Sequence, residues 1–331
     1  MFEFLQRSEF AKNIFILVSG STIAQTIPLL AEPILSRIFT PEEFGVFEIY
    51  LALVSMLGVI GTARYEMAVI LPRTENKAVN VLGLALFFGA AFSLLILLLF
   101  YLGSEWVLSI IPAENFGPYL FYVPLGIFLL TINRGMGQWQ LRQKQMQAIS
   151  YSKVTESSTK AGSSILLGTL NFSSLGLIWG QLSGTFFAAL NMFGKFLRTD
   201  RKKSIFLSMK QMLALARKYS EFPKNNVPIA LSEVLQISGV IFVFSFYFDT
   251  NAVGEFSKAL RILFIPIFLI STPISQAFYQ KASRDYLQGK DISADLRRIV
   301  FNLLKWSVLP LIVFVLISPW LFGFVLGPLW V

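Results

Sequence analysis

The sequence contains no cysteine and no histidine, and only 14% of its 331 residues are charged. The lack of cysteine excludes a disulfide framework and a thiolate metal site. The lack of histidine removes the commonest general base and metal ligand. Since a soluble chain usually carries about a quarter charged residues, the low share of charged residues also points away from a soluble protein.

Apolar residues dominate instead, at 55% of the chain, and the mean hydropathy is +0.64. A helix needs about 20 mostly apolar residues to cross a membrane. The pattern predicts an all-α polytopic membrane protein with about nine transmembrane helices. The expected spans are 13–36, 44–70, 79–102, 117–139, 151–170, 174–194, 226–248, 254–279 and 300–322.

The positive charge follows this topology. If the N-terminus lies in the cytoplasm, all but three of the 28 Lys and Arg residues fall on the cytoplasmic side, the exceptions being Arg37, Lys258 and Arg261. This orientation satisfies the positive-inside rule. It also explains the net charge of +9 without a nucleic-acid partner.

One motif occurs twice. "SRIFTPEEFGVF" at 36–47 and "SFYFDTNAVGEF" at 245–256 match at four positions in register, 209 residues apart. Six expected spans lie between the copies, so the seventh helix enters the membrane in the direction of the first. Parallel repeats of this kind form one of the standard transporter plans. We therefore expect a six-helix lobe at 1–200, a basic cytoplasmic linker with an amphipathic segment at 201–222, and the first three helices of a second lobe at 223–331.

Charged residues at membrane depth are the candidate site, because an ionisable group there costs about 2.5–3.5 kcal/mol on insertion scales and normally faces a wet cavity or a partner. Arg64 and Glu66 lie near the inner end of the second span. Arg64 could instead snorkel to the interface, whereas the short side chain of Glu66 snorkels poorly. Arg134 and Arg261 belong to the same class.

The fifth span is the most polar. Lys153, Glu156 and Lys160 lie at i, i+3 and i+7, on one helix face. This face should line a cavity or contact another helix, and a plain ion pair between Glu156 and Lys160 is the alternative. Glu32 and Glu233, one in each lobe, are candidates for ion coupling or for pairing with arginines.

Three further patterns concern packing and aromatic side chains. Gly176, Gly180 and Gly184 recur every four residues and predict a close helix–helix contact. Prolines in two of the spans predict kinks, at Pro28, Pro33, Pro266 and Pro273. Four aromatic residues are candidates either to stack on sugar rings or to anchor the chain at the interface: Tyr65, Trp139, Tyr151 and Trp179.

The sequence argues against an enzyme. It has no Asp-x-Asp motif and no histidine, and the expected outer connections are short. We therefore predict no catalytic residue, no metal site and no cofactor.

Four stretches resemble the bacterial Wzx-type polysaccharide flippases of the MOP superfamily. They are "LSRIFTPEEFGVFEIYLALVSMLGVIGTARYEMAVILP" (35–72), "QWQLRQKQMQAIS" (138–150), "KYSEFPKNNVP" (218–228) and "VGEFSKALRILFIPIFLISTPISQAFYQKA" (253–282). The resemblance implies two lobes of a MATE-like fold and usually twelve or more helices. Because this sequence ends near "GPLW", we expect a second lobe shorter than in those relatives.

The resemblance also implies a function. Such proteins move undecaprenyl-diphosphate-linked oligosaccharide, a unit of O-antigen, capsule or exopolysaccharide, across the bacterial inner membrane by alternating access. It implies a cationic cavity, onto which Arg64, Arg134, Lys160 and Arg261 map, with polysaccharide polymerase and chain-length machinery as candidate partners. The alternatives are a multidrug exporter of the same superfamily, which would need a more acidic cavity, and an inactive truncated remnant.

Overall fold

The computed structural model describes residues 9–111 and 116–264 and, beyond them, 297, 301, 305, 312, 316–318, 320 and 322–330. All regular structure in these residues is helical, as the sequence predicts. The chain divides into two compact units, Met1–Gly254 and Glu255–Val331, and each is described by itself.

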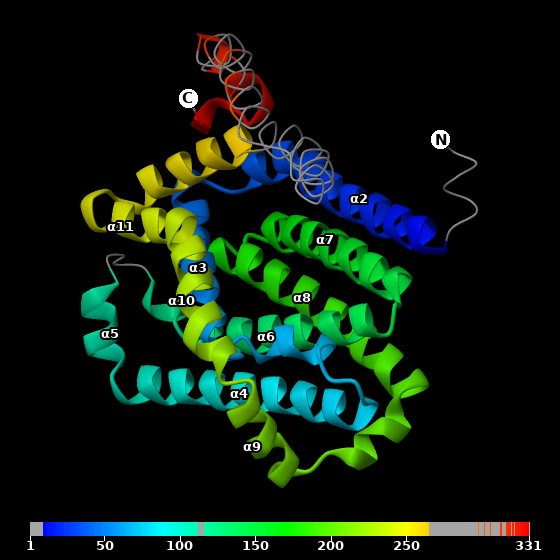
Figure 1. Ribbon diagram of the computed structural model, residues 1–331. Coiled ribbons are helices and arrows are strands. Elements are labelled where there is room, and N and C mark those ends of the chain that lie inside the picture. The colour runs from blue at the N-terminus through cyan, green and yellow to red at the C-terminus, as the bar shows by residue number, and fades with distance from the viewer. Residues whose placement is uncertain are drawn as a thin grey trace. The chain divides into compact units, whose positions relative to one another are not determined.

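The first unit contains most of the described helices (Figure 1). In chain order they are α2 (Glu9–Ile38), α3 (Pro41–Gly61), η1 (Tyr65–Ile70), α4 (Glu75–Leu102), α5 (Ser104–Ile110), η2 (Gly117–Tyr119), α6 (Tyr122–Arg142), α7 (Met146–Thr169), α8 (Ser174–Thr199), η3 (Arg201–Phe206) and α9 (Met209–Lys218). An interrupted helix follows, made of η4 (Phe222–Asn226), α10 (Val227–Val234), η5 (Leu235–Gly239) and α11 (Val240–Tyr247). Residues 250–264 are again helical.

Five helical segments in the described residues are long and apolar enough to cross a membrane: Phe15–Ile38, Pro41–Gly61, Glu75–Leu102, Gly117–Arg142 and Phe222–Tyr247. They coincide with five of the nine predicted spans. The more polar α7 and α8 cover the predicted spans 151–170 and 174–194. The predicted spans 254–279 and 300–322, with Pro266 and Pro273, lie largely or wholly outside the described residues.

One predicted span is too long. The sequence predicts a helix over 44–70, whereas α3 ends at Gly61 and η1 follows a turn. In that turn Ala63 and Arg64 have φ of 48° and 60°, and two consecutive left-handed residues cannot continue an α-helix. Pro28 and Pro33 do lie inside α2, as predicted.

The glycine pattern of α8 makes the predicted close contact. α8 lies beside α7, and α2 lies along the other side of α7 (Figure 1). A Cβ added at Gly184 would come within 2.6 Å of the Glu156 carbonyl oxygen, and one at Gly180 would overlap the Ser164 hydroxyl. Small residues thus let the two backbones approach, as in membrane helix pairs.

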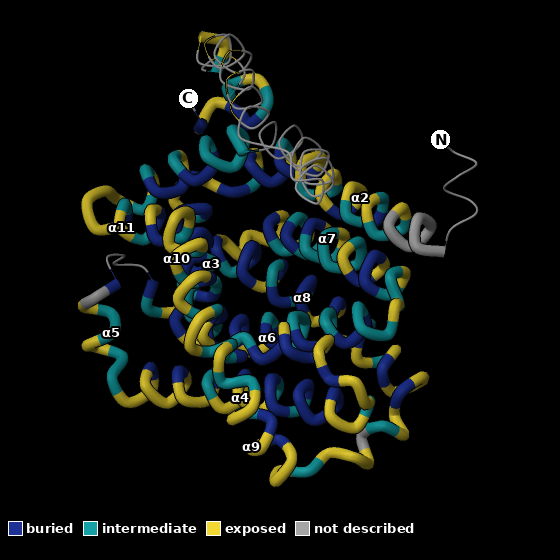
Figure 2. Tube along the Cα trace, in the orientation of Figure 1, coloured by how far each residue is buried: buried dark blue, intermediate teal, exposed yellow. Residues whose placement is uncertain are grey.

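α3 is the most deeply buried of the five apolar segments, whereas few residues of α10 and α11 are buried (Figure 2). Local hydrogen bonds fix the start of α3. The Thr40 hydroxyl accepts a hydrogen bond from the Glu43 amide at 3.3 Å, and the Glu43 carboxylate accepts one from the Thr40 amide at 2.8 Å. This is a capping box with proline at the first helical position. The local sequence "TPEE" therefore specifies where the buried helix begins.

The two copies of the repeated motif adopt the same local structure. The first serine of each donates to the carbonyl three residues earlier, at 3.3 Å for Ser36 and 2.6 Å for Ser245. Four residues later, Thr40 and Asp249 each accept the amide of the third residue of the next helix, at 3.3 and 2.8 Å. All these positions are 209 residues apart. The weak sequence match therefore corresponds to a shared local structure at the two motifs.

The matched glycines of the two copies also contact each other reciprocally. A Cβ added at Gly45 would overlap the carbonyl oxygen of Thr250, and one at Gly254 would overlap that of Pro41. Pro41 and Thr250 are themselves equivalent positions of the repeat. The contact therefore has local two-fold character, and it needs glycine on both sides because the opposing atoms belong to the backbone.

We predict that Gly45→Ala and Gly254→Ala destabilise the protein to a similar extent, by about 1–3 kcal/mol each, because each new methyl group forces backbones apart. Gly137→Ala is the matched control, since nothing lies within 4 Å of a Cβ at that helical position. Thermal unfolding of the purified protein in detergent measures the effect. Unchanged melting of both variants would contradict the reciprocal contact.

Candidate functional site

The turn after α3 positions the first two predicted site residues. Arg64 has a left-handed backbone conformation, which costs roughly 1–2 kcal/mol for a residue other than glycine. The turn brings Arg64 Nη1 within 3.6 Å of Glu66 Oε1, with the Glu66 side chain only 3% exposed. A strained turn thus holds an ion pair at the end of an apolar helix.

This pair leaves polar atoms unsatisfied. Arg64 Nε, Glu66 Oε2 and the nearby Thr62 hydroxyl are buried and make no hydrogen bond in the described structure. Buried polar groups of this kind cost free energy unless water, an ion or a ligand satisfies them. Since these three buried polar atoms belong to neighbouring residues of one turn, the turn is a candidate site for a polar ligand.

Arg134 on α6 joins the same group. It lies within electrostatic range of both Glu66 and Arg64, and its Nη1 donates to the Gly58 carbonyl of α3 at 2.8 Å. A guanidinium has five N–H donors. In the described structure this is the one hydrogen bond that Arg134 makes, and its other nitrogens are not fully buried. We call Arg64, Glu66 and Arg134 the cationic cluster.

The predicted charged face of α7 lies against α2 and α3. Lys153 donates to the Ser21 hydroxyl at 3.0 Å, and the Lys160 ammonium lies 5.5 Å from the Phe47 ring centroid. Glu156 interacts electrostatically with Lys160 and then Lys153. The α7 residues therefore form a second charged group in helix–helix contacts.

The other predicted site residues are dispersed. Glu32 is buried in α2, with 8% exposure, whereas Glu233 is exposed on α10. Arg261 is half-buried on the helical residues 250–264 and belongs to the second unit. The structure thus brings together Arg64, Glu66 and Arg134, and separately Glu156 and Lys160.

Sequence reasoning missed a polar contact between α6 and α8. Asn133, next to Arg134, donates to the Thr185 carbonyl at 2.8 Å, and Gln181 donates to the Thr185 hydroxyl at 3.2 Å. Asn133 Oδ1 and Gln181 Oε1 are buried without a partner. The amides at 133 and 181 within apolar spans were the signal that could have revealed it.

A second missed network joins several helix ends. Glu75, at the start of α4, accepts from Arg142 at 3.2 Å and from Lys203 at 3.0 Å, and Lys203 also reaches Asp200 at 2.7 Å. Burial lowers the pKa of Lys203, but its hydrogen bonds to Asp200 and Glu75 outweigh that effect and leave the pKa above its ordinary value.

Two of the four aromatic residues are core residues. Trp139 is fully buried and donates to Asp200 Oδ2 at 3.1 Å, and Tyr65 is 5% exposed and donates to the Ala216 carbonyl at 3.1 Å. The proposed roles in sugar stacking or interfacial anchoring are therefore wrong for Trp139 and Tyr65, because tertiary contacts enclose both rings. Tyr151 and Trp179 are exposed.

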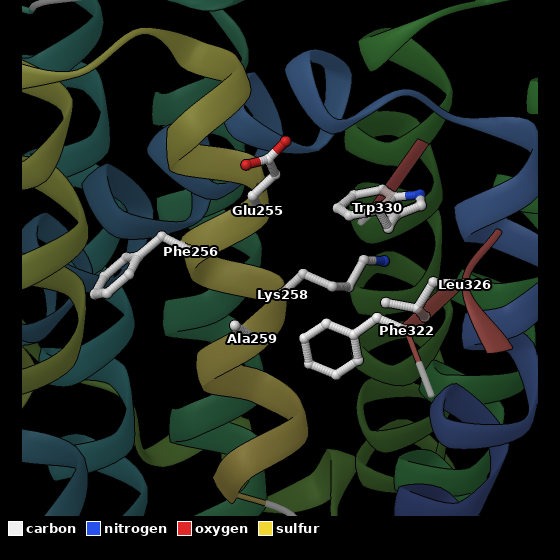
Figure 3. Close-up of a pocket in the computed structure, with 7 residues that line it drawn as sticks. All are labelled: Glu255, Phe256, Lys258, Ala259, Phe322, Leu326 and Trp330. Atoms are coloured by element: carbon white, nitrogen blue, oxygen red, sulfur yellow. The ribbon is translucent and has the colours of Figure 1, made fainter. Parts of the chain in front are cut away.

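The second unit has its own cavity of about 300 Å³, in which Lys258 extends past Phe322 toward Trp330 (Figure 3). The Lys258 ammonium lies 4.6 Å from the Trp330 ring centroid, and the residue is 3% exposed. A cation–π contact of this kind stabilises a buried ammonium. None of the eight predicted site residues lines this cavity.

Within the described residues, no group of three or more acidic side chains is placed to hold a metal ion. Arg and Lys outnumber Asp and Glu in the charged groups described above.

Comparison with known families decides the wider identity. A family model described as "Polysaccharide biosynthesis protein" matches residues 34–331. The chain belongs to the polysaccharide biosynthesis protein family. This membership confirms the resemblance to polysaccharide proteins seen in the sequence.

Two named proteins add detail to the family membership. The succinoglycan biosynthesis transport protein ExoT of Rhizobium meliloti (strain 1021) is 24% identical over 263 residues, covering 77% of this chain and 51% of ExoT. The chain therefore spans about half the length of that relative. A solved multidrug resistance MATE family transporter of the MOP superfamily, in an outward-facing conformation, matches with a TM-score of 0.53 and 18% identity, over 80% of this chain and 63% of its own.

The structural match shows that this member of the polysaccharide biosynthesis protein family shares the fold of that solved transporter. Together with the five apolar helices, it identifies a multi-pass membrane protein. Both named proteins are transporters by name.

We predict that Lys203→Met lowers the melting temperature at neutral pH, because it leaves Glu75 and Asp200 without their shared cation. Since the folded pKa of Lys203 is raised, its stabilisation is complete below about pH 10 and is lost as the pH rises through the folded pKa. The difference in melting temperature from wild type should therefore be constant between about pH 7 and 9 and shrink above about pH 11.

The control is Lys202→Met, which removes a neighbouring exposed lysine and should melt as wild type does. Thermal unfolding followed by intrinsic fluorescence across this pH range provides the measurement. Equal melting of the two variants at every pH would show that the network does not stabilise the fold.

Proposed function

We propose that the protein translocates a diphosphate-linked oligosaccharide lipid, the undecaprenyl-diphosphate-linked repeat unit of a surface polysaccharide, across the bacterial inner membrane. The observation that carries the proposal is the cationic cluster. Two arginines and one glutamate stand at the end of a buried apolar helix, and most of the Arg134 donors have no protein acceptor among the described residues.

The chemistry of a diphosphate fits this cluster. A planar guanidinium can bind phosphate oxygens through two parallel hydrogen bonds. Glu66 offsets part of the charge of Arg64 and Arg134, so the group carries a net positive charge when empty and is not left as two unpaired cations in an apolar setting. A bound diphosphate would satisfy donors that the protein leaves open. Lys160 and Arg261 are proposed as further cationic contacts, and Glu32, Glu156 and Glu233 as coupling or pairing groups.

The orientation proposed here has the N-terminus in the cytoplasm. The cations concentrate at the ends of α4, α6 and α8 and in η3 and α9, which the positive-inside rule assigns to the cytoplasmic side. Arg64 and Glu66 follow the C-terminal end of α3, which this orientation places on the cytoplasmic side. The cationic cluster would therefore first meet the diphosphate from the cytoplasmic leaflet.

Alternating access between two lobes is the proposed mechanism. The two motif copies share their capping hydrogen bonds and meet at Gly45 and Gly254, which supports two equivalent lobes built from parallel repeats. In this proposal the lobes are residues 1–200 and 223–331, joined by the linker 201–222. The glycine contact lies at the end of α3 opposite the cationic cluster, where it would close the periplasmic side.

Two other functions compete with this proposal. The MATE transporter shares the fold alone, and a multidrug exporter for cations would favour an acidic site, which the excess of arginine over glutamate opposes. The remaining alternative is that the chain is an inactive remnant, which inserts in the membrane but transports nothing. Complementation separates these possibilities.

We predict that Arg134→Gln abolishes surface polysaccharide in a strain lacking its own flippase, because it removes the guanidinium with open donors. The strain receives this chain alone or together with a separately expressed second half, and polysaccharide is read on a gel. Arg198→Gln on α8, an exposed arginine, is the matched control and should leave display unchanged at equal protein level. Normal display by the Arg134 variant would exclude the cluster from transport.

The role proposed for Arg261 is tested in the same strain. Arg261→Ala should abolish display while the amount of protein in the membrane stays unchanged. Normal display would remove Arg261 from the proposed site without affecting the assignment of Arg64 and Arg134.

A further inference from the structure

A group of basic side chains lies outside the cationic cluster, near the junction of η1 and α4. A cavity of about 390 Å³ is bounded there by Leu71, Pro72, Arg73, Thr74, Lys77 and, from α9, Lys218 with Tyr219. We call it the η1–α9 pocket. Three cations from two separate parts of the sequence therefore face one small space.

The charge of this pocket is not neutralised by the protein. Arg73, Lys77 and Lys218 make no ion pair with any described residue, and Lys218 contacts only the ring of Tyr219, 5.6 Å from its centroid. The nearest acid along the chain, Glu75, is already bound to Arg142, Lys203 and Gln143. The Thr74 hydroxyl accepts no capping hydrogen bond from the first turn of α4, and a hydroxyl can also donate to an anion.

The surroundings of the pocket favour a lipid. Leu71, in its wall, is 56% exposed, and next to it Ile70 is 42% exposed. On α9, Met212 and Leu215 are buried while Met209 and Leu213 are 63% and 58% exposed. Exposed apolar side chains interleaved with lysine and arginine are typical of a helix lying in the membrane interface. A headgroup phosphate would thus reach the cations while its acyl or prenyl chain covers the apolar residues.

We propose that the η1–α9 pocket binds a lipid whose headgroup is a phosphate monoester or a diphosphate. Such groups carry close to two negative charges at neutral pH and several acceptor oxygens, which suits three cations and a hydroxyl better than the single charge of a phosphodiester. The site is separate from the cationic cluster, and the inference does not require the protein to transport anything.

Binding is measured by native mass spectrometry on the full chain in neutral detergent, with dioctanoyl phosphatidic acid as the monoester probe. Dioctanoyl phosphatidylglycerol is the phosphodiester probe, and inorganic pyrophosphate tests a headgroup without a chain. We expect the double variant Lys77→Gln/Lys218→Gln to weaken phosphatidic acid binding by about tenfold or more. The pair Lys77→Arg/Lys218→Arg should retain it.

Lys202→Gln/Lys210→Gln is the matched control, because it removes two exposed lysines of η3 and α9 that do not line the pocket. Its affinity should stay within about twofold of wild type. Equal loss in the two double-glutamine variants would overturn the pocket, since binding would then follow overall charge. Equal binding of phosphatidic acid and pyrophosphate would overturn the lipid assignment.

The same measurement on Arg134→Gln distinguishes this inference from the proposed function. Unchanged phosphatidic acid binding is expected, even if that variant abolishes polysaccharide display. Loss of binding in Arg134→Gln with full binding in Lys77→Gln/Lys218→Gln would place the lipid in the cationic cluster and contradict the pocket.

Discussion

The candidate site depends on how the buried side chain of Glu66 is accommodated among apolar helices. Glu66 is 2% exposed, and a lone carboxylate at such a site costs several kcal/mol. Its pairing with Arg64 requires the strained left-handed turn that ends α3, and Arg134 approaches because α3 and α6 are close enough for its hydrogen bond to Gly58. The end of α3, the contact of α6 with α3 and the candidate site therefore coincide around this ion pair.

Close backbone approach is the complementary constraint. Gly58 would, with a Cβ, come within 2.7 Å of Leu130, and Gly184 makes a comparable approach to α7. Glycine therefore occurs where helices approach closely: at Gly58 on α3, whose carbonyl accepts from Arg134 of α6, and at Gly184 on α8, beside the backbone of α7. The reciprocal contact of Gly45 and Gly254 repeats this solution between the two motif copies. In the proposed mechanism, the glycines at these contacts permit the helices to shift against one another.

The features predicted correctly from the sequence are those encoded locally. Apolar runs identified the five long spans, and four-residue spacing identified the glycine face of α8. The features missed depend on distant partners. The buried Trp139 donates a hydrogen bond to Asp200, 61 residues away. The left-handed turn at Arg64 accompanies its contact with the buried Glu66. The η1–α9 pocket forms because Lys218 and Tyr219 lie beside the residues that precede and begin α4. Sequence reasoning assigned the pocket lysines only a topological role, because a charge count does not show which cations lack partners.

The most direct test of the central claim is photocrosslinking in membranes, with a lipid-linked oligosaccharide analogue that carries a photoreactive group beside its diphosphate. Mass spectrometry of the digested protein then identifies the labelled peptides. We predict labelling of peptides that contain Arg64 and Arg134, and less labelling when an unlabelled diphosphate lipid competes. Labelling confined to the exposed α10 and α11, with none in the cationic cluster, would contradict it.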